Sequence, residues 1–387
     1  MKMELETKIE KNMKITKMLL LSRYDNLGAS SRYRSYQYIP YLRKEGIEIT
    51  VAPLFDNDYI NDLYAGRKKN LLKVLRVYAK RIINLYHVRD FDVIWIEKEA
   101  LPWLPAWIEH KLGLTKATYI VDYDDAIFHR YDQHHFKLIR WILGKKIDRI
   151  IQYAALVLVG NEYLLERAKK AGARRIELLP TVIDLRKYPS TFFNDNDIFT
   201  IGWIGSPITS HYLKLVIPAL EEICKNNTAR LVLIGAKRED LPTNIPVKYV
   251  SWSIFNKSNQ FLVIIFTFSL SWSEETETKE IQKFDVGIMP LPNNVWERGK
   301  CGLKLIQYMA CGKPVIGSSV GVNKKIIKHG INGYQARNID EWIWAINKLK
   351  DDPKLRQKMG KVGREIVERN YCLQVTAPKL HKILKNL

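Results

Sequence analysis

The sequence predicts an α/β fold made of two doubly wound parallel-sheet units in series. Short apolar segments with a strand pattern alternate with helical segments along most of the chain, and this alternation is typical of parallel sheets. A polar, turn-rich segment, 185–199, interrupts the series, and the alternation then restarts at residue 200. The chain of 387 residues is long enough for two or three domains with cores of their own.

The first series of predicted elements follows a charged tail, 1–13. An apolar strand pattern at 15–23 leads into a loop that contains Gly28, and the next helix ends near Gly46. A strand of sequence IEITVAP comes directly afterwards, and this strand–loop–helix–strand order indicates a parallel sheet. We therefore assign residues 14–190 to a first, Rossmann-like unit. Its further strands are expected at 91–97, 117–125 and 154–161, and 174–184 is expected to form another short strand and a loop.

The second series restarts with the strand TIGWIG at 200–205 and continues with a helix around YLKLVIPALEEICKN. We assign residues 191–370 to this second unit and expect a basic helix at 371–387. Ligands of such sheets bind at the carboxyl ends of the strands, so two units that face each other would form the site in the cleft between them. The further strands are expected at 229–235, 246–250, 284–290 and 313–319.

One apolar segment does not fit the second series. The tripeptide SWS occurs at 251–253 and again at 271–273, and removal of 254–273 would leave an uninterrupted series of elements. Two interpretations are open. Either 254–273 is an insertion bounded by a short direct repeat, which would add a helix or impair folding, or the tripeptide recurs by chance.

The composition indicates an anionic partner. The formal net charge is +21, which favours binding to nucleic acid, to an acidic membrane surface or to phosphorylated ligands. No helix-turn-helix, zinc-finger or RNP-type signature accompanies the basic residues, so we expect no nucleic acid. The four cysteines form no CxxC pair, which argues against a zinc site and indicates a reducing compartment.

The sequence contains no predicted membrane span. The N-terminal stretch MKMELETKIEKNMKITK is charged throughout and lacks the apolar core of a signal peptide. The longest apolar run, 261–270, is shorter than the roughly 20 residues that cross a bilayer. We expect a cytoplasmic protein that meets a membrane, if it does so, from the side and on the inner face.

The segment WERGKCGLKLIQYMACGKPV, 296–315, carries the main functional signal. At 100° per residue, a helix over 302–311 places one apolar arc toward the sheet. Gly312 ends this helix. The opposite arc is expected to be polar and clear of the core, and contains Lys304, Gln307, Tyr308 and Cys311.

The first turn of this helix is expected to bind an anion. A helix N-terminus already carries partial positive charge, so a lysine is unfavourable there unless an anion joins it. Gly302 permits close approach of the backbone, and the N–H groups that begin at Leu303 would converge with Lys304 on one anion. Arg298 and Lys300, just upstream, add positive charge.

The stretch FDVGIMPLPNNVWERGKCGLKLIQYMACGKPVIGSSVGVNKKIIKHGINGY resembles the donor-binding region of family 4 glycosyltransferases, the group 1 type of the GT-B superfamily. The resemblance is strong from 284 to 335 and looser in the N-terminal half. It implies the GT-B fold, with two Rossmann-like domains facing a cleft and the nucleotide-sugar in the C-terminal one. It also implies retaining transfer without a metal or cofactor, and a last helix, 371–387, that crosses back to the N-terminal domain and helps to close the cleft.

The sequence departs from the family pattern at the donor site. The family has two glutamates around the helix start, where Gly299 and Gln307 stand here. It also has an arginine after the first strand of the donor domain, where Ser206 follows Gly205. We still expect Gly205 and Ser206 to face the donor. Gln307 would either bond a ribose hydroxyl or lie on a solvated helix face.

The family's GR…KG pattern supplies cations after the first strand of the donor domain, and these are absent here; we expect cations of the segment 298–304 to replace them. We expect Arg298, Lys300 and Lys304 to stabilise the diphosphate leaving group as the glycosidic bond breaks, with Arg298 and Lys304 acting in catalysis. In the N-terminal half, NLGASSRYR resembles the glycine loop that approaches the donor phosphates from across the cleft.

That loop supplies further donor-binding candidates. Gly28 and Ser30 would donate hydrogen bonds to phosphate, and Arg32 would hold it by charge together with Arg34. The alternative is that the arginines lie on the surface of a helix without binding phosphate.

Carboxylates follow two predicted strands of the first unit. In IVDYDDAIF, Asp122, Asp124 and Asp125 either cap a helix or bind the acceptor, with Asp124 and Asp125 orienting the attacking hydroxyl. Glu99, with Glu97 in IEKEALP, either lines the same cleft on the acceptor side or is solvated at the surface. No metal site is expected from these aspartates, because the resemblance implies a metal-independent reaction.

Two basic amphipathic stretches, 67–83 and 134–149, lie in the same half. In the first, Leu71, Leu75 and Ile82 form a stripe with Tyr78 and Ala79. We expect the apolar stripes to pack on the sheet and the basic faces to contact either solvent or anionic lipid headgroups.

The predicted function is retaining transfer of a hexosyl group from a nucleotide-diphosphate-sugar to a glycan or lipid-linked acceptor, as in cell-envelope polysaccharide synthesis. Two alternatives stay open. The lost glutamates suggest a non-transferring GT-B-like nucleotide-sugar binder or an epimerase, and the charge alone suggests a nucleic-acid-binding protein. The sequence does not distinguish the sugar, the nucleotide or the acceptor.

Overall fold

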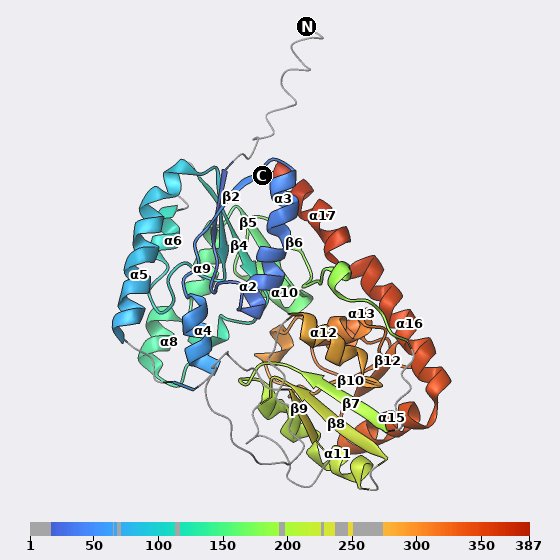
Figure 1. The fold of residues 1–387 in the computed structure, drawn as a ribbon. Coiled ribbons are helices and arrows are strands. Elements are labelled where there is room, and N and C mark those ends of the chain that lie inside the picture. Colours follow the sequence, from blue (N-terminus) through green and yellow to red (C-terminus); the bar gives the residue numbers. More distant parts are fainter. Residues whose placement is uncertain are drawn as a thin grey trace, which may run out of the picture. The chain divides into compact units, whose positions relative to one another are not determined.

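The computed structural model describes residues 17–64, 66–67, 71–112, 117–192, 198–225, 228–236, 247–250 and 274–387. They belong to two compact units, each shown in Figure 1. The first runs to Thr181 and takes in Leu373–Leu387, and the second comprises Val182–Cys372. The tail 1–13 and the segment 254–273 lie outside the described residues.

The change from one unit to the next comes earlier than residue 190, where the sequence places it. Val182 already belongs to the second unit. The backbone there pairs with that unit, since the N–H of Ile183 donates to the carbonyl of Tyr371 at 3.2 Å and that of Thr191 to the carbonyl of Cys311 at 3.0 Å. These long-range bonds, which composition does not reveal, set the boundary.

The first unit contains a six-stranded parallel sheet of order β2-β1-β3-β4-β5-β6. β3, β4 and β5 are almost wholly buried, as expected for a sheet covered on both faces. The short strand expected within 174–184 is present as three residues, and it ends before Pro180, which has no N–H with which to continue the ladder. The strands are β1 (Lys17–Leu21), β2 (Glu48–Val51), β3 (Val93–Glu97), β4 (Thr118–Tyr123), β5 (Leu156–Val159) and β6 (Ile176–Leu178).

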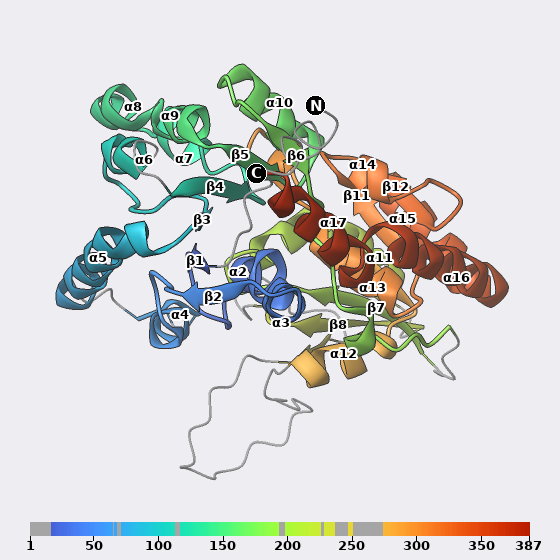
Figure 2. The ribbon, with the colours of Figure 1, turned by 90° about the horizontal axis from the view of Figure 1, so that it is seen from above.

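Helices cover both faces of this first sheet. In Figure 2, α5, α6, α8 and α9 lie on one side of it and α2, α3 and α17 on the other. The final helix α17 packs on α3, and Tyr38 Oη lies 3.1 Å from Thr376 Oγ1. The helices are α2 (Ala29–Arg34), η1 (Tyr36–Tyr38), α3 (Ile39–Lys44), α4 (Asn57–Tyr64), α5 (Leu71–Tyr86), η2 (His87–Asp90), α6 (Trp107–Leu112), α7 (His129–Asp132), α8 (Lys137–Leu143), α9 (Lys146–Tyr153), α10 (Glu162–Lys170) and α17 (Leu373–Lys385).

Helix α5 is turned the opposite way from the sequence prediction. Leu71 and Leu75 of its apolar stripe are 71% and 58% exposed. Arg81 is buried instead, and its Nη2 donates to the carbonyl of Ser22 at 2.7 Å. The expectation that this stripe packs on the sheet is therefore wrong, because a buried arginine bound to the end of β1 orients the helix.

The second unit contains a six-stranded parallel sheet of order β12-β11-β10-β7-β8-β9. Its core lies between β7, β8, β10 and helices α11 and α15, and includes the fully buried Trp203. β12 is absent from the sequence prediction. The strands are β7 (Phe199–Ile204), β8 (Ala229–Ile234), β9 (Val247–Val250), β10 (Val286–Met289), β11 (Val315–Ser318) and β12 (Gly333–Ala336).

The helix expected around YLKLVIPALEEICKN is present as a 3-10 turn followed by a shorter α-helix, α11. Val216, at the junction, is fully buried. The helices are η3 (Leu185–Lys187), η4 (Ser210–Leu215), α11 (Ile217–Cys224), α12 (Glu274–Gln282), η6 (Glu297–Gly299), α13 (Leu303–Ala310), α14 (Asn323–Ile326), α15 (Ile339–Asp351) and α16 (Pro353–Asn370).

Each sheet has one point where the strand order reverses. In the first unit the reversal lies between β1 and β3, and in the second between β7 and β10. Loops that leave neighbouring strands in opposite directions open a crevice at such a point, and this is where doubly wound sheets bind ligands. The loops after these four strands, together with the helices α2 and α13 that follow two of those loops, contain most of the predicted site residues.

Candidate functional site

In the second unit, Lys304 lies beside the reversal point with no acidic partner. Its Nζ is 4.0 Å from the centroid of the Trp203 ring and 3.4 Å from Thr209 Oγ1. Among the described residues, no carboxylate lies within salt-bridge distance of this lysine. Burial, followed by the nearby charge of Lys300, holds the pKa of Lys304 well below its usual value. The site is therefore electrostatically incomplete without an anion.

Two glycines position this lysine. Gly302, which precedes α13, has φ 71°, and a residue with a Cβ would be strained in this conformation. Glycine also has no side chain that could cap the helix. The first N–H groups of α13 thus remain available beside Lys304. At Gly205, a Cβ would lie 2.4 Å from Trp203 Cη2 and 2.6 Å from Lys304 Nζ. Only glycine leaves room for the lysine at the end of β7.

Hydroxyl groups complete this side of the site. The turn after Gly205 is closed by the N–H of Thr209, which donates to the carbonyl of Ser206 at 2.9 Å. Ser206 Oγ lies 3.5 Å from Thr209 Oγ1. The structure therefore brings the predicted residues Gly205, Ser206 and Lys304 together. It adds Thr209 and Trp203, which the sequence did not indicate.

The other two predicted cations of the motif are placed differently. Arg298 is exposed, and its Nε donates to Asn293 Oδ1 at 3.0 Å. Lys300 lies over the ring of Trp296, with Nζ 6.0 Å from the centroid. Leu303 is half-buried at the start of α13. Lys300 thus contributes charge close to Lys304, whereas Arg298 bonds within its own loop.

Gln307 does not lie on a solvated helix face. It is buried, and its Nε2 donates to Tyr188 Oη at 3.0 Å and to Glu277 Oε1. Tyr308 and Cys311 of the same predicted polar arc are fully buried. The expectation of an amphipathic helix was wrong for α13, because α16 packs against it as well as the sheet. Gln307 is consequently held by internal bonds.

Glu297 is a functional candidate that the sequence analysis missed. It is buried; one carboxylate oxygen accepts a hydrogen bond from Tyr212, and Oε2 has no hydrogen-bond partner among the described residues. A buried carboxylate oxygen without a partner is costly unless a ligand reaches it. The sequence offered one signal for it: Glu297 lies two residues before Gly299, where the family pattern has a glutamate, and no other acidic residue is close to that position in the sequence.

In the first unit, the loop after β1 is tied to the strand ends beside it. Ser30 Oγ donates to Asp124 Oδ2 and accepts from Lys98 Nζ at 3.0 Å. Gly28, just before α2, is buried against Tyr24. Arg32 donates to the carbonyl of Asn26 at 3.3 Å. The predicted phosphate-binding loop therefore bonds mainly to neighbouring protein groups.

Asp124 and Asp125 lie around Lys98, which the sequence analysis did not single out. Lys98 Nζ is 3.0 Å from Asp124 Oδ1 and 3.6 Å from Asp125 Oδ2. Burial would raise the pKa of Asp124, but Lys98, the bond from Ser30 and the charge of Arg34 lower it to about 2. Lys98 has φ 65°, a strained conformation that tends to occur at functional sites.

Asp122 and Arg34 form a buried pair rather than separate ligand-binding groups. Arg34 Nε and Nη2 donate to the two oxygens of Asp122, and Nη1 donates to the carbonyl of Leu179 at 2.6 Å. Both side chains are about 1% exposed. The predicted acceptor role of Asp122 and the phosphate role of Arg34 do not fit this geometry, since each satisfies the other.

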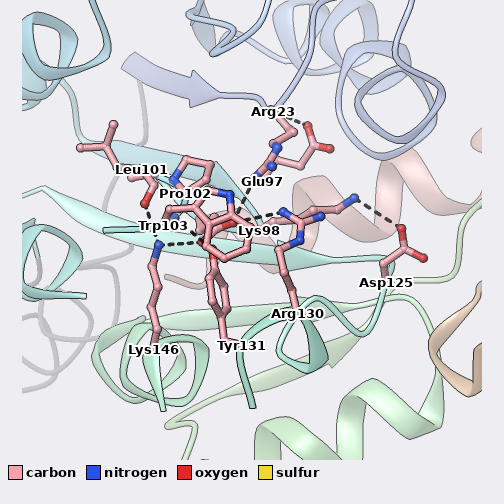
Figure 3. A network of polar contacts seen from close by, with 12 residues as sticks. Arg23, Glu97, Lys98, Leu101, Pro102, Trp103, Asp125, Arg130, Tyr131 and Lys146 are labelled. Carbon is pink, nitrogen blue, oxygen red and sulfur yellow. Dashed lines mark hydrogen bonds and ion pairs between the residues drawn. The ribbon is translucent and has the colours of Figure 1, made fainter. Parts of the chain in front are cut away.

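Glu99 is the centre of a buried polar network rather than a solvated strand end. Its carboxylate accepts from Arg23 at 3.0 Å, Lys146 at 2.6 Å and Tyr131 at 2.7 Å. Figure 3 shows these three side chains converging beside Trp103. Burial raises the pKa of Glu99, but Lys146 and Arg23 outweigh it and the net shift is downward. This network gives a rigid support for the loop after β3.

Neither metal ligands nor membrane-spanning helices are found in the described parts of the chain. There, no group of three or more histidine, cysteine, aspartate or glutamate side chains is arranged to hold a metal ion. None of the helices described is long and apolar enough to cross a bilayer.

The second unit matches a known family. Residues 192–366 match the model described as glycosyl transferases group 1. The N-acetyl-alpha-D-glucosaminyl L-malate synthase of Bacillus anthracis is 38% identical over 78 residues, 19% of this chain and 20% of that protein. An uncharacterised glycosyltransferase of Methanocaldococcus jannaschii is 24% identical over 192 residues, 48% of this chain and 44% of that protein. The chain spans less than half the length of either relative.

Solved structures show the same fold over nearly the whole chain. Sucrose-phosphate synthase of Thermosynechococcus elongatus has a TM-score of 0.68 at 15% identity, covering 95% of this chain and 98% of that one. Anabaena HepE, solved with UDP-glucose, has a TM-score of 0.67 at 13% identity, covering 96% and 100%. Residues 192–366 therefore match the group 1 glycosyltransferases, and the chain as a whole has the fold of these solved structures, with two parallel-sheet units as in GT-B glycosyltransferases.

Proposed function

We propose that the chain is a retaining glycosyltransferase that moves a hexosyl group from a nucleotide-diphosphate-sugar to a glycan or lipid-linked acceptor, without a metal ion. The observation that carries this proposal is the half-buried Lys304, which lies on the ring of Trp203 and has no acidic partner among the described residues. A diphosphate leaving group would supply the missing negative charge. The UDP-glucose complex of HepE supports a nucleotide-sugar as the ligand.

The leaving group would be stabilised from three directions. Lys304 and Lys300 would supply charge, the first N–H groups of α13 would donate hydrogen bonds, and Ser206 and Thr209 would add hydroxyl groups. Charge that develops on the diphosphate as the glycosidic bond breaks is stabilised best by such preset donors. Two cations at this point make a metal ion unnecessary.

Carboxylates near the donor sugar would come from new positions. Glu297 offers an unpartnered buried oxygen two residues before Gly299, and Glu277 is bonded to Gln307. We propose that Glu297 binds a hydroxyl of the donor sugar. Gln307 would then be a positioning residue rather than a ribose ligand.

The acceptor would be bound by the first unit. Asp124 and Asp125 are carboxyl groups beside Lys98, and the oxygens of either can accept a hydrogen bond from an acceptor hydroxyl. In a retaining front-face reaction, the departing phosphate itself accepts the proton of the attacking hydroxyl, so no side-chain base is required. Envelope polysaccharide synthesis is the context we propose for this acceptor.

The test is a panel of UDP- and GDP-sugars, with release of the nucleoside diphosphate as the readout and EDTA in a parallel series. The proposal predicts release with one donor class, unchanged by EDTA and lost in Lys304→Ala. Equal turnover by Lys304→Ala would contradict it, as would loss of activity in EDTA.

A second candidate function is binding of a nucleotide-sugar without transfer. It is favoured by Gln307, an amide where the family pattern has a carboxylate, held by two internal bonds. Donor binding in calorimetry combined with no release of nucleoside diphosphate, with or without acceptor extracts, would select this function.

A further inference from the structure

The first unit exposes an unusual number of large apolar side chains on one side. On α5, Leu72 and Ile83 are 67% and 58% exposed, and on α8 Trp141 is 82% exposed. α5, α6 and α8 lie on the same side of the first sheet (Figure 2). We call this surface the apolar face. Its members are Leu71, Leu72, Leu75, Ile82, Ile83, Tyr86, Trp103, Trp107, Phe136, Leu138, Trp141 and Ile142.

Contacts join the parts of the apolar face into one surface. Tyr78 of α5 donates to the carbonyl of Pro102 at 2.8 Å. The next residue, Trp103, has its ring 5.8 Å from that of His134, which stacks at 5.6 Å on Phe136 at the start of α8. The chain of contacts therefore runs from α5 through the loop after β3 to α8.

Charge is arranged along the edge of this apolar face. At 100° per residue, the exposed apolar side chains of α5 fill one arc of roughly 120°. The exposed Arg76 and Lys80 both lie beyond one edge of that arc. On α6, Lys111 Nζ lies 5.4 Å from the ring centroid of Trp107, and the exposed Lys137 belongs to α8. Aromatic and aliphatic groups bordered by cations are typical of helices that lie in a membrane interface.

We infer that the apolar face docks the first unit on a membrane that contains anionic lipids. The apolar side chains would enter the boundary between headgroups and acyl chains, and the bordering cations would contact lipid phosphates. Such a patch on a monomeric protein usually marks an interaction site, and its cationic border matches an acidic lipid surface rather than a neutral one.

The apolar face also lies next to the proposed acceptor side. Trp103 N donates to Tyr131 Oη at 3.1 Å, and Tyr131 belongs to the Glu99 network. Docking would therefore hold the loop after β3 near the lipid surface. This last step rests on the proposed transfer to a lipid-linked acceptor, whereas membrane docking itself does not.

The test is flotation of the full chain with two kinds of vesicle, pure phosphatidylcholine and phosphatidylcholine with phosphatidylglycerol, at rising salt and without donor. We expect binding to the anionic vesicles that weakens as salt rises. Arg76→Gln with Lys80→Gln should weaken binding roughly 30-fold, since each charge contributes about five-fold near the surface. Trp141→Ser with Leu72→Ser should weaken binding at high and low salt alike.

A matched control uses exposed residues of the second unit. Lys358→Gln with Lys361→Gln on α16 removes the same charge outside the apolar face and should leave flotation unchanged. Equal loss in this control would overturn the inference, as would no flotation of the unaltered chain at low salt.

Light scattering distinguishes membrane docking from the main alternative, in which a second copy of the chain covers the apolar face. A concentration-dependent dimer that Trp141→Ser with Leu72→Ser converts to monomer, without flotation, would contradict membrane docking. Release of nucleoside diphosphate, measured in solution on the same variants, reports on the proposed transferase independently. Loss of flotation with retained release would leave the transferase proposal intact, and the reverse would leave the docking inference intact.

Discussion

The two reversal points of the molecule differ in how their buried charges are satisfied. In the first unit, Arg34 and Asp122 form a two-pronged pair, and Glu99 accepts bonds from Arg23 and Lys146. In the second unit, Lys304 has an aromatic ring and a hydroxyl but no carboxylate partner among the described residues. The first arrangement is complete within the protein, whereas the described residues supply no anion to the second.

This difference distinguishes charges that stabilise the fold from charges that are available to bind a ligand. A buried charge with its partner in place stabilises a loop geometry, and removal of one partner leaves the other uncompensated. A buried cation without a partner destabilises the unliganded protein and is compensated when an anion binds. The strained Lys98 lies between these cases, since its partners Asp124 and Asp125 keep part of their surface open to solvent.

The largest expected effect follows from breaking the pair in the first unit. Asp122→Ala leaves the guanidinium of Arg34 buried without a carboxylate, so the free energy of unfolding of that unit should fall by about 3–5 kcal/mol. Urea unfolding followed by tryptophan fluorescence measures the change. The double variant Arg34→Met with Asp122→Leu should recover much of the loss. If Asp122→Ala unfolds like the unaltered chain, the pair has no structural role.

The next largest effect is expected in the second unit, where the variant removes a charge that has no acidic partner in the described part of the chain instead of breaking a pair. Lys304→Ala should lower kcat by roughly 10²–10³-fold, the size seen when a preset charge-stabilising donor is lost. The free energy of unfolding should stay the same or increase, because the variant removes a half-buried charge that has no acidic partner among the described residues. Kinetics and urea unfolding of the same preparation measure both. A large loss of stability would show that Lys304 is paired within the fold.

A smaller effect is expected at Glu297. Glu297→Gln keeps an oxygen that can accept from Tyr212 but removes the carboxylate charge, so turnover should fall by about 10-fold with little change in stability. Comparison of kcat and KM for the donor measures the effect. Glu277→Gln is the control, since Glu277 bonds Gln307 and should affect kcat less. Unchanged kcat in Glu297→Gln would remove this residue from the site.

The smallest effect concerns pH. Because burial lowers the pKa of Lys304 in the folded chain, the unfolded chain binds more protons between that pKa and the ordinary lysine value. Stability of the unliganded protein should therefore rise with pH across that window. Burial also lowers the pKa of Lys313, to about 8, so the relevant quantity is the difference between the unaltered chain and Lys304→Met.

Donor binding should show the matching proton uptake. A diphosphate beside Lys304 favours its charged form, so binding should take up protons in that window and weaken as pH rises. Calorimetry in buffers of different ionisation enthalpy measures this uptake. Lys304→Met should abolish the difference between buffers, and a persistent difference would assign the proton to another group.

The sequence by itself determined the two parallel-sheet units, the strand ends that carry polar residues and the first-turn position of Lys304. Those features depend on local periodicity and on spacing within one helix or loop. The position of Gly205 and Ser206 at a strand end was predicted in the same way, because both directly follow a strand pattern.

Only the tertiary structure decided which groups these residues meet. The partners Arg34 and Asp122 come from distant segments, as do Gln307 and Glu277, and no local pattern pairs them. Helical periodicity shows that the two faces of a helix differ, but contacts with the rest of the fold select the inner one. On α5 that contact is the bond of the buried Arg81 to the end of β1, and it leaves the apolar face outside.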